Sequence, residues 1–339
     1  MSQQANKKTE ARRELERLAE LALLIVGMST GLSGCFDSAN SAVPTADELG
    51  ATDFCSITTV KALEACESDV TEEMLIAEAV CVNIADDAER ADCEAEVVAA
   101  TDEAATECLA VAEARDSVCT LLGETRYDPV IDPADFVDPL QVGASVTPNR
   151  FLPLVPGNVW EYESPDGTVT VTVLEETIVI GGVTAIIVRD VEVEGGEVVE
   201  STDDYFAQDL SGNVWYFGET VQNFEDGVLT DLDGSFRHGI DGAKAGLLVP
   251  ADPQIGAAYR QEWAIAEAED LAEVLSLTAS ESTPGASCNG TCLQTREFTP
   301  LEPEVEENKF YVENVGVIVA FDVAEPDERE ELIRFTPAP

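Results

Sequence analysis

The residues best suited to chemistry gather in one short segment near residue 260. A strand here would place Tyr259 and Trp263 on one face and Arg260 and Glu262 on the other. The charged pair can bind a ligand or simply pair across a neighbouring strand. The candidate binding residues are Tyr259, Arg260, Glu262, Trp263, Glu267 and Asp270. Paired carboxylates do acid–base work when one is buried, but so acidic a chain forms such clusters by composition alone, and we assign no catalytic residue.

Two aspartate-containing turns carry a weak calcium signal. Asp209 and Asn213 flank one turn, and Asp231 and Asp233 lie in another. Oxygen ligands in tight turns are typical of calcium sites, but neither segment continues to the glutamate that completes an EF-hand loop. Because Asp-Gly hairpin turns explain both segments, we expect no cofactor and keep calcium as the open alternative.

The composition excludes several classes of protein. The 339 residues include 68 Asp+Glu and 18 Lys+Arg, a formal charge of −50 that would repel nucleic acid and anionic lipid. His238 is the one histidine, so a multi-histidine metal site cannot form and a Ser–His–Asp triad has one candidate base. We expect His238 to be a structural residue. The sequence leaves open whether the acidity reflects adaptation to salt or the binding of cations.

The first 35 residues have the pattern of an export signal. Basic residues up to Arg17 precede an apolar run from Leu21 to Leu32, which leads into Leu32-Ser33-Gly34-Cys35. This resembles a bacterial lipoprotein signal peptide, in which the cysteine is lipidated and becomes the mature N-terminus. The resemblance implies an anchor at Cys35 in the cell envelope, and in the outer membrane of a Gram-negative cell because Phe36 follows the cysteine. An uncleaved N-terminal anchor is the alternative.

The eight other cysteines are an even number, which is typical of disulfides formed outside the cytoplasm. Six of them have spacings of 11, 15, 12, 15 and 11 residues, which read the same in both directions. An antiparallel helical hairpin needs this palindrome if each cysteine faces another at the same height. The predicted pairs are Cys55–Cys119, Cys66–Cys108 and Cys81–Cys93, with a further local pair Cys288–Cys292 in a turn. A direct repeat of 26 or 27 residues stays open and would allow other pairings.

The local sequence around the six cysteines favours helix. No glycine occurs between Gly50 and Gly123, while Ala and Glu, both good helix formers, are frequent. The hairpin turn is expected at Asp86-Asp87, where an aspartate can cap the second helix. Sequences that resemble caps at Ser68-Asp69-Val70-Thr71 and Thr101-Asp102 predict that each arm is broken into two helices.

Beyond residue 150 the apolar pattern changes to period two, with turns such as Gly181-Gly182, which predicts an antiparallel β domain. A faint repeat at an offset near 100 residues relates Pro153…Trp160 to Pro253…Tyr259, and Tyr205-Phe206 to Phe310-Tyr311. We therefore expect two related meanders in one curved sheet or half-barrel.

The predicted fold class is thus α+β with several domains. The expected segments are a signal peptide at 1–34, a flexible tether at 35–52, a Cys-rich helical hairpin or small bundle at 53–122, a Pro/Asp-rich linker at 123–149 and an antiparallel β domain at 150–339.

Segments from Pro153 to about Arg334 resemble a group of uncharacterised secreted bacterial β domains. The resemblance rests on stretches such as Pro156-Gly157-Asn158-Val159-Trp160 and Gly212-Asn213-Val214-Trp215-Tyr216. That group brings no assigned activity, and its frequent histidine before the paired aromatics is replaced here by Asn308-Lys309.

We therefore expect a lipid-anchored, non-catalytic lipoprotein of the cell envelope that acts as a binding or structural module. Its expected partners are the membrane, through the lipid, and an unidentified protein or apolar ligand, but not nucleic acid. The alternatives are a carrier that holds an apolar ligand on the concave face of the β domain and, less favoured, a carboxylate-based hydrolase, which needs two carboxylates in one cleft.

Overall fold

The structure, a computed structural model of the chain, describes residues 43–44 and 49–339. Its contacts divide the chain into a helical unit that ends at Arg126 and a β unit from Tyr127 to Pro339. The predicted signal peptide, Cys35 and most of the tether lie outside the described residues. Within the described residues, the helices lack the combined length and apolar character that crossing a membrane requires.

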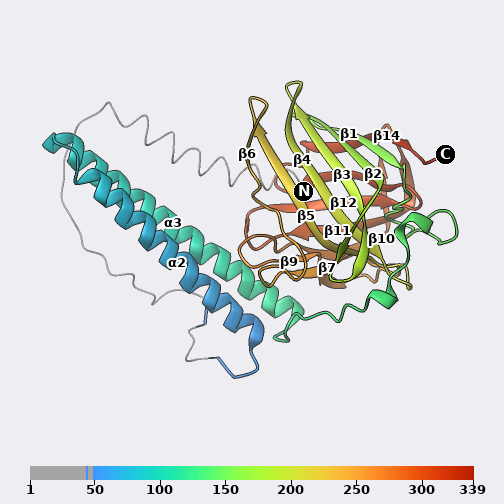
Figure 1. Cartoon of the computed structure of the whole chain (residues 1–339), viewed down its shortest axis with the longest axis horizontal. Coiled ribbons are helices and arrows are strands. Elements are labelled where there is room, and N and C mark those ends of the chain that lie inside the picture. Colours follow the sequence, from blue (N-terminus) through green and yellow to red (C-terminus); the bar gives the residue numbers. More distant parts are fainter. Residues whose placement is uncertain (1–42, 45–48) are drawn as a thin grey trace. The chain divides into compact units, whose positions relative to one another are not determined.

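The helical unit is an antiparallel hairpin of two long helices, α2 (Phe54–Cys81) and α3 (Asp87–Leu122), as the sequence predicts (Figure 1). Asp86 begins the second helix, because its side chain accepts hydrogen bonds from the backbone N–H groups of Ala88 and Glu89. The hairpin turn thus lies where the cysteine palindrome has its centre.

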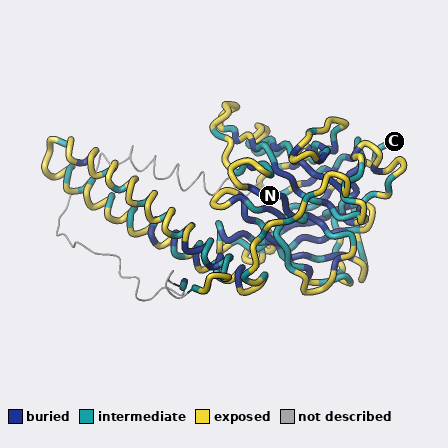
Figure 2. The backbone as a smooth tube through the Cα atoms, turned by 60° about the horizontal axis from the view of Figure 1, so that its bottom comes forward, coloured by how far each residue is buried: buried dark blue, intermediate teal, exposed yellow. Residues whose placement is uncertain are grey.

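Three disulfides join the two helices at successive heights. The bridged pairs are Cys55–Cys119, Cys66–Cys108 and Cys81–Cys93, with Cα–Cα distances of 5.5, 5.8 and 5.6 Å. The apolar cluster between the helices is small and includes Val60 and Ala112, while Leu75 and Val98 are exposed. Figure 2 shows how much of this hairpin is exposed. Covalent links, more than an apolar core, therefore hold the helices together.

The predicted breaks in the helical arms are wrong, because both helices are continuous. The hydroxyl groups of Ser68, Thr71 and Thr101 donate to the carbonyls of Glu64, Glu67 and Val97, each four residues back in the same helix. A hydroxyl that bonds to the preceding turn is satisfied inside a helix and needs no cap position.

The segment predicted as a linker is packed in large part onto the β unit. It contains two short 3-10 helices, Pro133–Asp135 and Pro139–Gln141, whose first turns are capped by the side chains of Asp132 and Asp138. Phe136 lies against Trp215 and Phe217, and the N–H of Val137 bonds to the carbonyl of Gln208. The prolines and aspartates that suggest a linker here form capped turns instead.

The β unit contains one antiparallel sheet of fourteen strands. Its strands are β1 (Val159–Glu163), β2 (Gly167–Ile180), β3 (Val183–Glu194), β4 (Glu197–Gln208), β5 (Val214–Glu225), β6 (Val228–Asp231), β7 (Lys244–Val249), β8 (Ala258–Arg260), β9 (Glu262–Trp263), β10 (Leu271–Ser282), β11 (Ser287–Phe298), β12 (Glu306–Val312), β13 (Gly316–Asp322) and β14 (Arg329–Thr336).

The sheet curves until its two ends nearly meet (Figure 1). The strand order is β8-β10-β11-β12-β13-β14-β1-β2-β3-β4-β5-β7-β9, and β6 pairs with β5. The end strands β8 and β9 are separated only by Gln261, and β7 and β8 lie in contact. Gly246 allows this approach, because a Cβ there would lie 2.1 Å from the carbonyl oxygen of Gln261. The predicted curved sheet is confirmed and is almost a closed barrel.

The two halves of the sheet repeat the same meander, β1 to β5 and then β8 to β13 without β9. In the first half Gly157 N–H donates to Val173 O, and Val173 N–H donates to Asn158 O. In the second half Gly256 N–H donates to Val274 O, and Val274 N–H donates to Ala257 O. The faint sequence repeat therefore corresponds to a repeated hydrogen-bond pattern.

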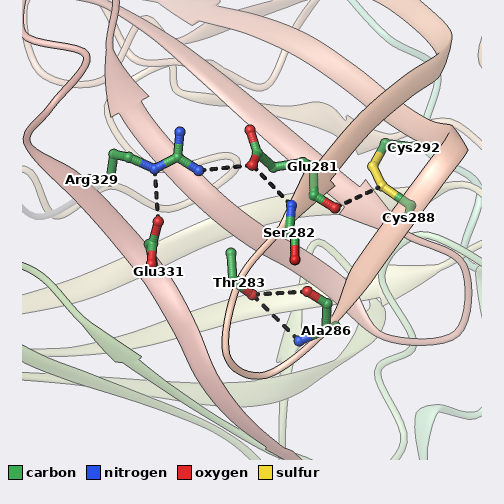
Figure 3. A network of polar contacts seen from close by, with 8 residues as sticks. All are labelled: Glu281, Ser282, Thr283, Ala286, Cys288, Cys292, Arg329 and Glu331. Atoms are coloured by element: carbon green, nitrogen blue, oxygen red, sulfur yellow. Dashed lines mark hydrogen bonds and ion pairs between the residues drawn. A yellow bond between two sulfur atoms is a disulfide. The ribbon is translucent and has the colours of Figure 1, made fainter.

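Cys288 and Cys292 are bridged, but they lie in β11 instead of in a hairpin turn. Cys292 is opposite Ala279 and Cys288 is opposite Glu281, so two extra residues bulge from the strand between them. The hairpin turn lies earlier, where Thr283 bonds to Ala286 (Figure 3). Figure 3 also shows Arg329 paired with carboxylates on both sides.

Loop length should rank the contributions of the three hairpin disulfides to stability. Bridges across sequence separations of 64 and 12 residues are expected to stabilise by about 4 and about 3 kcal/mol in the chain-entropy account. We expect Cys55→Ala/Cys119→Ala to lower the free energy of unfolding of the helical unit more than Cys81→Ala/Cys93→Ala does. Urea unfolding followed by helical circular dichroism measures both losses, and the reverse order would contradict this expectation.

Candidate functional site: a carboxylate cluster inside the β unit

The inner face of the sheet carries a large apolar core and, beside it, several ionisable side chains. The core draws on both halves of the sheet, with Trp160, Val173, Phe206 and Leu332 among its buried members. Along β4 the side chains of Asp204 and Phe206 point to this face, while Tyr205 and Ala207 pack in a separate cluster. Asp204 is therefore an acid at a position where the strand pattern calls for a core residue.

Four carboxyl groups come together there, and we call Asp204, Glu219, Glu262 and Asp270 the acidic cluster. Asp204 is opposite Glu219 in the β4–β5 pair, and the backbone N–H of Glu262 bonds to the carbonyl of Asp270. Asp204 and Glu262 are 7% and 3% exposed, whereas Glu219 and Asp270 are half-buried. The cluster thus has a buried interior and an edge that solvent reaches.

Hydrogen bonding satisfies this cluster unevenly. The hydroxyl of Tyr216, which is fully buried, donates to Oδ1 of Asp204. In contrast, Oε1 of Glu262 is buried without a hydrogen-bond partner among the described residues. A buried carboxylate oxygen without a partner is costly, because it has lost water and gained nothing in return.

Burial raises the pKa values of all four carboxyls, and Lys309 counteracts part of this rise at Asp270. Burial raises the pKa of Asp204 to about 7 and that of Asp270 to about 6. Burial also raises the pKa of Glu219 and Glu262 well above the ordinary value, with Asp204 adding repulsion to the first and Asp270 to the second. At neutral pH Asp204, Glu219 and Glu262 therefore hold protons to a greater extent than exposed carboxyls do.

A second group on the same face is compensated by a lysine. Nζ of Lys309 lies 2.7 Å from Oε2 of Glu297 and 3.4 Å from Oε2 of Glu307. Tyr311 OH and Thr295 Oγ1 donate to Oε1 of Glu297 at 2.8 and 3.0 Å. Burial alone would lower the pKa of Lys309, but the two glutamates raise it above its ordinary value. Lys309 is therefore held as a buried cation.

The structure separates the six binding candidates of the 260 segment. Glu262 and Asp270 belong to the acidic cluster. Tyr259 lies near Glu297: burial is the main cause that raises the pKa of this tyrosine, and the negative charge of Glu297 raises it further. The other three lie apart from the cluster: Arg260 lies over the ring of Tyr127, Trp263 packs beside the same ring, and Glu267 accepts a bond from Gly234 N–H.

Sequence reasoning missed Asp204, Glu219, Glu297 and Lys309. The alternation of the strands could have revealed them, because each is an ionisable residue at an inward position where an apolar residue is expected. In β4 the inward series runs Thr202, Asp204, Phe206. In so acidic a chain these carboxylates do not stand out by composition.

The calcium candidates Asp209 and Asp231 lie in turns where their carboxylates accept hydrogen bonds from the protein. Asp209 accepts bonds from the backbone of Ser211 and Asn213 and from the indole of Trp215. Asp231 accepts from the amide of Asn223 and from Asp233 N–H. Within residues 43–44 and 49–339, no group of three or more His, Cys, Asp or Glu is arranged to hold a metal ion.

His238 also has a structural role. Its Nδ1 accepts a hydrogen bond from Ala245 N–H at 3.0 Å, and its ring lies edge-on against Phe217. Burial, together with Lys244, lowers the pKa of this imidazole.

No family model matches the sequence, and searches of curated proteins and of solved structures find no match either. The resemblances to lipoprotein signals and to secreted β domains stay predictions.

The raised pKa of Asp204 should make the β unit less stable as the pH rises. The folded state holds this proton up to about pH 7, whereas the unfolded chain releases it near the ordinary value of 3.8. The contribution of this proton to the free energy of unfolding is therefore fully present below pH 3.8 and is lost as the pH rises through about 7. The pKa values of Glu219, Glu262 and Asp270 are also raised, so these carboxyls act in the same direction.

The variant Asp204→Asn keeps a neutral side chain at every pH. Between about pH 4.5 and 7.5 we expect it to lose less stability than the wild type, by a few kcal/mol, because each pKa unit corresponds to about 1.4 kcal/mol. Urea unfolding at the two pH values measures the difference. Glu197→Gln is the matched control, because Glu197 is an exposed acid at the start of the same strand. If the free energy of unfolding depends on pH equally in the wild type and in Asp204→Asn, the raised pKa of Asp204 is refuted.

Removing Lys309 should destabilise the β unit strongly. Lys309→Met leaves Glu297 and Glu307 buried without their cation, which is expected to cost about 3–5 kcal/mol. The control is Arg150→Met, because Arg150 and Glu313 form an exposed pair and such pairs contribute about 0–1 kcal/mol. Thermal or urea unfolding gives both values, and similar losses for the two variants would show that Lys309 has no special role.

Proposed function

We propose that the chain is an exported, lipid-anchored binding module of the cell envelope that performs no catalysis. The observation that carries this proposal is the ladder of three disulfides in the helical hairpin. Disulfides form and persist in oxidising compartments, which supports export. The Leu32-Ser33-Gly34-Cys35 motif, outside the described residues, supplies the anchor, in the outer membrane if the cell is Gram-negative.

In this proposal the helical unit acts as a spacer or contact element. A helix rises about 1.5 Å per residue, so the 36 residues of α3 extend roughly 54 Å. Its side chains are mostly exposed, and cross-links at three heights fix the pairing of the helices. Such an element suits the separation of two attached parts better than the enclosure of a ligand.

The β unit carries the binding element, and the acidic cluster is its most specific feature. Carboxyl groups with a buried, unpartnered oxygen are retained at a cost to stability, which is typical of functional sites. The apolar carrier is less favoured, because the inner face holds charged groups such as Lys309 and Glu297 beside its apolar core. The hydrolase alternative keeps one supporting observation, the raised pKa values of Asp204 and Asp270.

The anchor is tested by intact mass spectrometry of the full chain expressed with its signal in a bacterium. We expect the mature protein to begin at Cys35 and to carry the mass of acyl chains. Cys35→Ser should lose the acyl mass, whereas Cys292→Ser, a cysteine outside the motif, should keep it. A wild-type protein that retains Met1 or lacks acyl mass would refute the lipid anchor.

A further inference from the structure

The duplicated meander allows the two halves of the inner face to be compared position by position. Tyr205-Phe206 of β4 corresponds to Phe310-Tyr311 of β12, so Asp204 corresponds to Lys309. Asp204 is opposite Val188 on β3, and Lys309 is opposite Thr295 on β11. Two residues further along these strands, Asp190 corresponds to Glu297. Each half therefore places an acid beside the position of Asp204 or Lys309.

In the second half this arrangement is complete. Lys309 contributes its ammonium group to Glu297 and Glu307, and Glu297 also accepts two hydroxyl hydrogen bonds. On the neighbouring strand β13 the residue opposite Lys309 is Ala320. One buried cation thus contacts two carboxylates and partly compensates their charge.

In the first half the cation is replaced by another acid. Asp204 stands in the place of Lys309, and Glu219 is opposite it where the second half has Ala320. Two oxygen atoms, Oδ1 of Asp190 and Oε1 of Glu262, are buried without hydrogen-bond partners among the described residues. Glu262 as a whole is 3% exposed, and the acids that raise its pKa, after burial, are Asp270, Glu219 and Asp204. Among the described residues, the first half therefore has the acceptors of a cation site but an acid where the second half has its lysine.

We propose that the acidic cluster, with Asp190, binds a small organic cation whose ammonium group takes the place that Lys309 occupies in the other half. This assignment rests on the binding role proposed for the β unit and names its ligand class. A protonated primary amine has the charge and the three donors of a lysine head group, so it can bond to the unpartnered oxygens. Glu219 and Asp270 are half-buried, so the cluster is in contact with solvent at these two carboxyls.

An organic cation fits better than a metal ion for two reasons. The carboxyl groups of the described residues are not arranged to hold a metal. Aromatic side chains also border the cluster, since the ring of Tyr216 packs against Phe206 at 4.7 Å and Phe236 at 5.4 Å between centroids. Aromatic faces attract ammonium groups and contact the methylene groups of an alkyl amine.

The test uses the diamine putrescine as the probe and the full chain in about 0.15 M salt, which screens exposed charges. Isothermal titration calorimetry is expected to show one putrescine bound per chain. Glu262→Gln, which preserves size and replaces a carboxyl oxygen with an amide group that cannot ionise, should weaken binding at least about tenfold. Asp204→Lys, which copies the second half, should abolish binding and raise the melting temperature without ligand.

Two controls separate this site from general attraction to an acidic protein. Glu197→Gln removes an exposed charge from the same strand as Asp204 and should leave the affinity unchanged within about twofold. Butane-1,4-diol, which lacks charge, should not bind. If Glu262→Gln does not fold, Glu219→Gln takes its place, and melting curves establish folding for every variant.

The inference is overturned if wild-type protein does not bind putrescine, or if Glu197→Gln weakens binding as much as Glu262→Gln. Tighter binding of calcium with the same dependence on Glu262 would identify a metal site and overturn it too. None of these results would affect the acyl mass at Cys35, so a failed ligand assignment is distinguishable from a failed anchor.

Discussion

The interior of the β unit is organised by the cost of burying charge. A carboxylate removed from water is strongly destabilised unless a cation or hydrogen-bond donors replace the water. Around Lys309 that replacement is complete, with an ion pair of 2.7 Å and two hydroxyl donors on Glu297. Around Asp204 the described residues supply the hydroxyl of Tyr216, and the pKa of Asp204 remains raised by burial.

This difference between two halves of one duplicated sheet is informative because the backbones are alike. The same meander and the same turn hydrogen bonds occur twice, so the scaffold does not explain why one half is compensated. The side chains at Asp204 and Glu219 do, since Lys309 and Ala320 hold the matching positions. Proteins commonly accept such local instability where a ligand supplies the missing interaction.

The helical unit has a small apolar core, and disulfides stabilise it. Its sequence is rich in Ala and Glu and has few large apolar residues that face the partner helix, so burial contributes little. Disulfides limit the freedom of the unfolded chain and compensate for that small core.

Much of the fold could be predicted from the sequence, because the deciding signals are local or periodic. The cysteine spacing predicts a hairpin with its centre at Asp86, and alternation with paired glycines predicts the antiparallel sheet. The continuity of the helices could not be read in the same way, because Ser68 and Thr101 suit either a cap or a bond to the preceding turn. The packing of residues 127–149 depends on contacts such as Phe136 with Phe217, which no local pattern reveals.

The site was predicted only in part, and the reason is the background of acidic residues. Glu262 and Asp270 were found as neighbours in sequence, whereas Asp204 and Glu219 join them through strand pairing between distant segments. With 68 acids in the chain, composition does not distinguish a buried carboxyl from an exposed one. The register of the strands, which sets the inward face, makes that distinction.

Whether the charge of Asp204 is uncompensated in the free protein is measured most directly by NMR titration of its carboxyl carbon, without and with putrescine. The account predicts a midpoint near the pKa of about 7 in the free protein, and a clear fall when an ammonium group is bound beside it. A midpoint near the ordinary value of 3.8 in the free protein would contradict the account, because Asp204 would then already have a compensating partner.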